Sequence, residues 1–229
     1  VILQMTALRL GAPEDFPFID RPSARLVRDG YDTLQELGAI DRTRELTDIG
    51  KALADLPVDP RIGRMILAST EEGCLGEMLV IASALSVQDP RERPANRKSE
   101  ADLAHAAFRD SRSDFLGFLR LWRADTKARE EMGSSKYRNW CKRHHLSVPR
   151  LREWTSVHRQ LEQLVAERIQ RSGRQRKAIA PPREDPPSGA IHRSILSGLL
   201  ANVGHRTESG EYQGVGGIRF EIFPRSEEH

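Results

Sequence analysis

LGAIDRTRELTDIGKALADLPVDPRIGRM, residues 37–65, is the stretch that decides the fold expected for this chain. Thr47 can accept early backbone N–H groups as a helix N-cap, and Asp48 in the first turn is favoured by the helix dipole. Pro57 cannot extend that helix, because its ring removes a donor and clashes with the preceding turn. A short turn-rich wing therefore stands directly before a helix.

The residues on either side complete the unit. After Pro22, apolar residues recur at spacings of three and four, which predicts a helix that Gly38 closes as a C-cap. The two wing strands are expected at residues 39–40 and 45–46. A helix, a two-stranded wing and a second helix predict a small winged-helix unit. Such units often read DNA grooves with the second helix, but Asp48 in that helix would face the phosphates and argues against groove reading.

The middle of the chain has the apolar periodicity of a helical bundle. Gly73 and Gly76 interrupt the apolar run 62–85, which predicts two helices with a tight corner at 72–75. Further helices are expected at 101–108 and 113–122 and along a stripe from Leu151 to Val165. Between these helices we expect a polar loop at 88–99 and a charged segment at 123–135 that ends in a loop.

A Pro-rich stretch marks the clearest boundary. Two Pro-Pro pairs in AIAPPREDPPSG, residues 178–189, exclude helix and keep the backbone extended. A new unit then begins at Ile191 with a short helix. Residues 211–215 and 219–223 alternate as strands around several glycines.

Several separate blocks of this chain resemble the C-terminal region of DEAH-box RNA helicases, and the bacterial HrpA type most closely. The resemblance implies a mainly α fold in which a winged helix and a ratchet-like helical bundle precede a partial OB-like β unit. The expected segments are a connector from an absent motor (1–21), the winged helix (22–60), the bundle (61–177), a Pro-rich linker (178–190) and a truncated OB-like domain (191–229). The blocks lie at 1–22, 37–67, 73–94, 137–154, 192–204 and 212–224.

Composition limits the possible cellular locations and protein classes. The 229 residues are enough for one large domain or two to three small ones. The two cysteines, Cys74 and Cys141, are too few for a disulfide framework, so a cytoplasmic setting fits best. No signal peptide is recognisable, and no apolar run approaches the roughly 20 residues needed to span a membrane.

Positive charge is concentrated in one segment. Residues 136–177 carry twelve Lys and Arg against three acids, whereas residues 1–135 carry nineteen bases and twenty-three acids. The segment also holds Tyr137, Trp140, two histidines and Trp154. Basic side chains neutralise phosphates and aromatic faces can stack on unpaired bases, so this mixture suits single-stranded RNA. The alternative is an ordinary helix pair with its aromatic side chains inside and its charged side chains in water. The two interpretations are compatible, because one face could pack while the other binds RNA.

The candidate RNA-binding residues come from this segment, the polar loop and the last unit. In the loop the alternative is a solvated surface, whereas phosphate contact along an RNA channel is the functional interpretation. The candidates are Arg91, Arg93, Arg138, Lys142, Arg143, Arg150, Arg152 and Arg206.

Catalytic and metal motifs are missing from the sequence. There is no GxxxxGK[ST] and no DEAH run, so ATP and Mg²⁺ are expected only in the motor of a longer parent helicase, and this fragment alone should be inactive. Cys141 with His144 and His145 lacks the partner ligands of a zinc site. QRSGRQRK at 170–177 superficially resembles an arginine finger but has no nucleotide to serve, and it suits a flexible basic linker.

Three function hypotheses follow. The first is the accessory region of an ATP-dependent RNA helicase, with single-stranded RNA and the RecA-like motor domains as partners and the ribosome as a further candidate partner. The second is a helical protein-interaction scaffold without RNA contact. The third is a winged-helix DNA regulator. Salt dependence of RNA binding separates the first two hypotheses, since phosphate contacts weaken steeply with salt.

Overall fold

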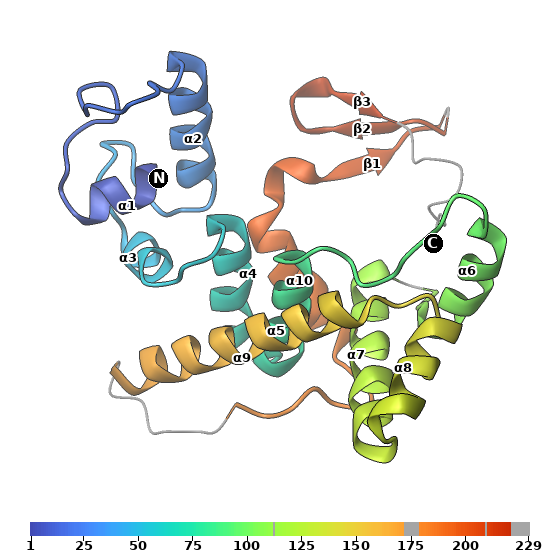
Figure 1. The fold of residues 1–229 in the computed structure, drawn as a ribbon. Coiled ribbons are helices and arrows are strands. Elements are labelled where there is room, and N and C mark those ends of the chain that lie inside the picture. The colour runs from blue at the N-terminus through green and yellow to red at the C-terminus, as the bar shows by residue number, and fades with distance from the viewer. Residues whose placement is uncertain (112, 172–178, 209, 221–229) are drawn as a thin grey trace. The chain divides into compact units, whose positions relative to one another are not determined.

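The computed structural model describes residues 1–111, 113–171, 179–208 and 210–220, which form two compact units. The first unit contains Val1–Glu72 and residues 192–220, and the second contains Gly73–Ile191. Helices dominate both units (Figure 1), which confirms the prediction of a mainly α fold with a small β part.

The two longest helices of the described residues lie in the second unit. The first unit holds α1 (Ile2–Ala7), α2 (Ala24–Glu36), α3 (Asp48–Ala54), α4 (Pro60–Glu71), β1 (Gly204–Arg206), β2 (Tyr212–Gly214) and β3 (Arg219–Phe220). The second holds α5 (Leu75–Leu85), α6 (Lys98–His105), α7 (Asp114–Glu131), α8 (Ser134–Arg143) and α9 (Val148–Arg171). Helix α10 (Ser188–Gly198) begins in the second unit and continues into the first, and 3₁₀ turns lie at Ala106–Phe108, Leu200–Asn202 and Val215–Gly217.

Helices α2 and α3 and the wing between them form as the sequence predicts. Gly38 has a φ of +68° directly after α2, a conformation that glycine adopts without steric cost. The wing strands reduce to one antiparallel bridge between Ile40 and Leu46. The hydroxyl of Thr47 accepts from the backbone N–H of Gly50 at 3.1 Å, which confirms the N-cap.

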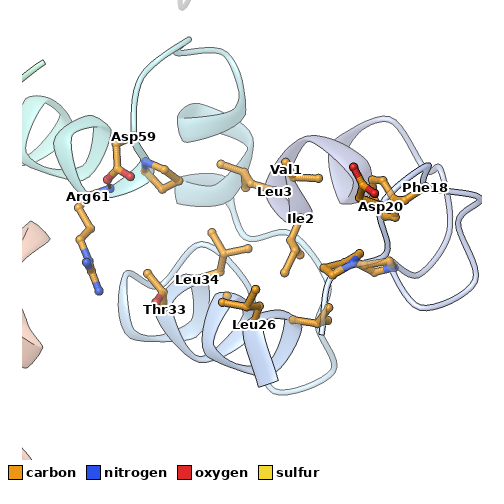
Figure 2. A pocket seen from close by; sticks show the side chains of 15 residues that line it. Val1, Ile2, Leu3, Phe18, Asp20, Leu26, Thr33, Leu34, Asp59 and Arg61 are labelled. Carbon is orange, nitrogen blue, oxygen red and sulfur yellow. Dashed lines mark hydrogen bonds between the residues drawn. The ribbon is translucent and has the colours of Figure 1, made fainter. Parts of the chain in front are cut away.

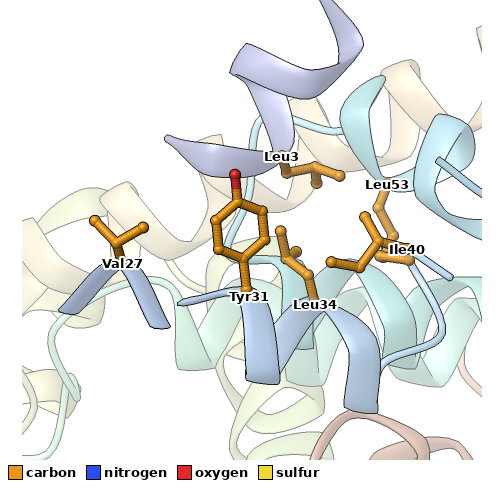
Figure 3. Packing of buried hydrophobic residues seen from close by; sticks show 7 residues of the cluster. Leu3, Val27, Tyr31, Leu34, Ile40 and Leu53 are labelled. Atoms are coloured by element: carbon orange, nitrogen blue, oxygen red, sulfur yellow. The ribbon is translucent and has the colours of Figure 1, made fainter. Parts of the chain in front are cut away.

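The core of the first unit joins α1 to this winged helix. Figure 3 shows Leu3, Tyr31, Leu34, Ile40 and Leu53 pointing toward one another, and each is at most 9% exposed. The segment expected as a connector thus supplies part of this core, and α1 is also tied to α3 because the Gln4 amide donates to the backbone oxygen of Ala54 at 2.9 Å.

Trp154 is the centre of the second unit. It is fully buried on α9, and its indole N–H lies 3.1 Å from the backbone oxygen of Val80 and 3.0 Å from the hydroxyl of Ser83 on α5. The rings of Phe118 and Trp122 on α7 contact the same indole, with centroids 6.1 and 5.0 Å away. One side chain therefore fixes α9 against α5 and α7, whose ribbons lie side by side in Figure 1.

The described part of the Pro-rich stretch before α10, residues 179–187, forms no helix or strand and is docked on α5. A Cβ at Gly76 would overlap with the backbone oxygen of Ala180, so only glycine permits this approach. The Arg183 backbone N–H donates to the buried carboxylate of Glu77 at 3.1 Å. The Arg183 guanidinium lies 3.5 Å from the same carboxylate and also donates to the backbone oxygen of Gly73.

Several element ends differ from the sequence-based prediction. Helix α7 continues through the charged segment to Glu131 because Asp125 and Ala128 are buried on its inner face. Helix α10 begins at Ser188 rather than Ile191. The corner between α4 and α5 lies at Glu72–Cys74, as expected, with Gly73 at a φ of +70°.

The last described residues form a three-stranded antiparallel sheet in the order β1-β2-β3. Strand β1 was not predicted, because three residues give almost no periodicity. An OB-like fold for this part remains a prediction, and the QRSGRQRK segment lies largely outside the described residues. None of the helices described is long and apolar enough to cross a bilayer.

Gly50 tests whether the wing must contact α3 directly. A Cβ there would overlap with the backbone oxygen of Ala39, so Gly50→Ala should lower the free energy of unfolding by about 1–3 kcal/mol through overpacking. Urea denaturation followed by circular dichroism measures the change. Gly133→Ala is the control, since a Cβ there meets no atom within 4 Å. Equal stability of the two variants would contradict this packing.

Candidate nucleic-acid interface

Helix α8 carries the densest group of predicted RNA-binding side chains. Arg138, Lys142 and Arg143 are all exposed on it, together with Lys136. Among the described residues, no carboxylate forms an ion pair with Lys136, Lys142 or Arg143. This outer side of α8 therefore presents positive charge to solvent.

The inner side of α8 is held by aromatic packing and one buried hydrogen bond. The Tyr137 hydroxyl donates to the Asp125 carboxylate on α7 at 2.6 Å, and Arg129 lies 2.8 Å from the same carboxylate. Burial raises the pKa of Asp125 and also that of Tyr137, which keeps the phenol protonated as the donor. Trp140 packs edge-on against Phe108, with centroids 6.2 Å apart.

This packing corrects the expected role of the aromatics. Tyr137, Trp140 and Trp154 are at most 9% exposed, and the indoles lie among other rings of the bundle. The His144 ring lies against Trp140 at 4.7 Å, with Nδ1 2.8 Å from the backbone oxygen of that residue. These faces are used by the core, so they cannot serve as stacking platforms for bases. The alternative with the aromatics inside and the charges outside is the one observed.

The loop before α6 is bound to the corner between α8 and α9. Arg91 pairs with both carboxylate oxygens of Asp89, at 2.7–3.1 Å, and its guanidinium lies 5.1 Å above the Phe118 ring. Arg150 donates to the backbone oxygen of Asp89 at 3.1 Å. Burial opposes ionisation, yet the hydrogen bonds and charge of Arg91 hold the pKa of Asp89 below its usual value. Arg91 and Arg150 therefore have structural partners.

The other predicted residues lie apart. Arg93 pairs with Asp102 at 2.7 Å, Arg152 is exposed on α9, and Arg206 belongs to β1 in the first unit. The structure thus brings together Arg138, Lys142 and Arg143, while Arg91 and Arg150 meet at Asp89. Contact of any of these residues with RNA remains a prediction.

Two hollows flank Lys142 in the second unit. The first, here called the corner hollow, has a volume of about 580 Å³ and is lined by Glu92, Asn96 and Arg97 of the loop and by Arg138, Lys142 and Leu146. The second, here called the α8 hollow, has about 530 Å³ and is lined by Met132, Lys136, Asn139, Lys142 and Arg143. Sequence reasoning did not select Glu92, Asn96 or Asn139, because nothing in their local pattern shows that they face basic side chains.

An apolar hollow of different chemistry lies in the first unit. Figure 2 shows side chains of α1, the following loop and α2 around it, among them Ile2, Phe18, Leu26 and Leu34. Its volume is about 590 Å³, and Asp20, Asp59 and Arg61 are the charged residues of its lining. With two acids against one base, this hollow suits an apolar side chain better than a phosphate chain.

Comparisons with known proteins identify relatives along the whole chain. The family described as "Helicase associated domain (HA2), ratchet-like" matches residues 59–147, and "Helicase associated domain (HA2), winged-helix" matches residues 32–58. The ATP-dependent RNA helicase HrpA homolog of Haemophilus influenzae is 41% identical over 99% of this chain, and the ATP-dependent RNA helicase HrpA of Escherichia coli is 40% identical over the same share. The probable ATP-dependent RNA helicase DHX34 of Mus musculus is 34% identical over 79% of the chain. The chain spans only 16–17% of the length of these relatives.

Asp89→Asn tests the pairing that holds the loop. The folded-state pKa of Asp89 is lowered, so its stabilisation is present above the ordinary carboxyl pKa of 3.8 and is lost as pH falls through the folded value. Because the Asp89 side chain is 43% exposed, we expect its carboxylate to add only about 1 kcal/mol to the free energy of unfolding at pH 7. Thermal unfolding of wild type and variant should therefore differ at pH 7 and converge in strong acid. Asp185→Asn, at an exposed position, is the control, and a difference that persists in acid would contradict the assignment.

Proposed function

This chain belongs to the helicase-associated (HA2) family of winged-helix and ratchet-like domains, and from this premise we propose that it is the strand-gripping part of an ATP-dependent RNA helicase. The family predicted from the sequence is thereby confirmed. In the proposal, ATP binding and hydrolysis belong to RecA-like motor domains elsewhere in the longer protein, and this region holds the single strand while the motor moves it.

The observation that carries the proposal is the division of α8 into two sides. Lys136, Lys142 and Arg143 lie in solvent, while Tyr137 and Trp140 are packed into the bundle. A surface with cations and no available aromatic faces attracts phosphates but cannot read bases by stacking. Such a surface holds a strand independently of the sequence of its bases. A region through which RNA advances requires this property.

The bundle behind this surface supplies stiffness. Tyr137 and Arg129 anchor α8 to Asp125 of α7, and Trp154 anchors α9 to α5. Cations on a rigid wall keep their spacing when a strand is pulled, so less conformational entropy is lost on binding. Motor movement could then be converted into strand movement and duplex separation.

A protein-interaction scaffold is the second candidate, and the apolar hollow of the first unit favours it. Its lining of Ile2, Phe18, Leu26 and Leu34 could receive apolar side chains of a partner. This function needs no nucleic acid. The two candidates therefore differ in whether the isolated chain binds RNA and in how such binding responds to salt.

Removing the cations of α8 should weaken strand binding. The combined change Lys136→Gln, Lys142→Gln and Arg143→Gln removes up to three phosphate contacts, and the plot of log K against log salt should lose about 2 from its slope, since each contact contributes about 0.7 on single strands. Fluorescence anisotropy with labelled oligouridylate over a range of salt concentrations measures both the slope and the affinity.

The matched control changes the same amount of charge elsewhere. Arg21, Arg25 and Arg28 are exposed at the start of the first unit, and their combined change to Gln should leave the slope nearly unaltered. Equal losses in both triple variants would indicate an effect of net charge only. Absence of binding by the wild-type chain at low salt would reject strand gripping and favour the scaffold.

A further inference from the structure

The corner hollow has walls of opposite chemistry. Pro94 and Val148 in its lining are half-buried and supply an apolar surface. Arg138 and Lys142 supply positive charge from α8. The loop contributes the amide of Asn96 and the carboxylate of Glu92, which are exposed side chains.

The backbone around this hollow is fixed. The Glu92 backbone N–H donates to the backbone oxygen of His145 at 2.8 Å, and that of Ser147 donates to the backbone oxygen of Pro90 at 2.8 Å. Arg91 and Leu146 form an antiparallel bridge between these bonds. His145 has a φ of +49°, the conformation in which the chain turns from α8 toward α9. Loop and corner therefore hold the hollow open before any ligand arrives.

These groups match the parts of a nucleotide. A flat base can lie on the apolar surface, because its ring faces are weakly polar. The Asn96 amide can donate and accept, and the Glu92 carboxylate can accept from a ring N–H at the edge of the base. Lys142 and Arg138 carry the charge that a phosphate requires. The volume of about 580 Å³ lies within the usual range of small-ligand sites, about 300–1,000 Å³.

We propose that the corner hollow takes up one unpaired nucleotide of the bound strand, with its base between the loop and α8 and its phosphate on Lys142. This inference rests on the proposed function and adds a base contact to it. Because Lys142 also lines the α8 hollow, the phosphates of the next nucleotides continue along the outer side of α8. The α8 hollow holds phosphates, and the corner hollow holds a base.

Asn96→Ala separates base contact from phosphate contact. With oligouridylate, we expect the affinity to fall about fivefold, the effect of about 1 kcal/mol for a lost hydrogen bond. With an abasic ribose-spacer strand of equal phosphate number, the same variant should bind like wild type. Lys142→Gln should weaken both strands by a similar factor. Asn202→Ala, at an exposed position of the first unit, is the matched control and should change neither affinity.

The outcomes distinguish this inference from the proposed function. Equal binding of oligouridylate and the abasic strand by wild type, with no selective effect of Asn96→Ala, would overturn the base contact and leave strand gripping intact. No binding of either strand at low salt would overturn both. Uridine monophosphate serves as a competitor, and it should displace the strand only weakly. Displacement at strand-like affinity would overturn the inference in favour of an independent nucleotide site.

Discussion

The hydrogen bonds from the Trp154 indole to α5 are the constraint on which the second unit depends. They place a large polar aromatic at the centre of the bundle with its only donor satisfied, so its burial costs little in lost hydration. Because α9 starts at the corner after α8, fixing α9 also fixes the position of Leu146 and the loop bridged to it. The basic side chains and the hollows are arranged around this uncharged indole.

The buried carboxylates that the structure describes in the bundle are all paired with basic side chains. Asp125 is buried with Tyr137 and Arg129, and Glu77 with Arg183. A buried carboxylate without such partners would carry a large desolvation cost. These pairs hold α8 on α7 and the Pro-rich stretch on α5, respectively. The cations that remain in water on α8 need no internal partner, which leaves them available to an external anion.

Much of the fold could be predicted because local chemistry determines it. Thr47 caps its helix, Gly38 and Gly73 adopt positive φ, and the corner after α4 lies where glycine interrupts the apolar run. The length of α7 could not be predicted, since the charged segment hides the inward positions of Asp125 and Ala128. Predicted connectors at the start of the chain and in the Pro-rich stretch turned out to be packed, because sequence shows extended backbone but not the surface it meets.

The candidate site was predictable in charge but not in orientation. A helix that alternates aromatic and basic residues is compatible with either type facing the ligand, and only the tertiary contacts of Trp140 and Tyr137 decide it. Likewise, two arginines of the loop looked equivalent to those of α8 until Asp89 and Asp102 were seen beside them. The positions of these arginines and acids in the sequence do not show that they will pair in the folded chain.

The place of Lys142 between two hollows has a mechanical consequence. An ammonium on a four-carbon stem is a mobile, hydrated point charge, whereas an arginine fork binds in one preferred plane. In the proposed strand-gripping function, the Lys142 ammonium could move from one phosphate oxygen to the next without releasing the strand. The strand would then stay bound to α8 and could still advance along it.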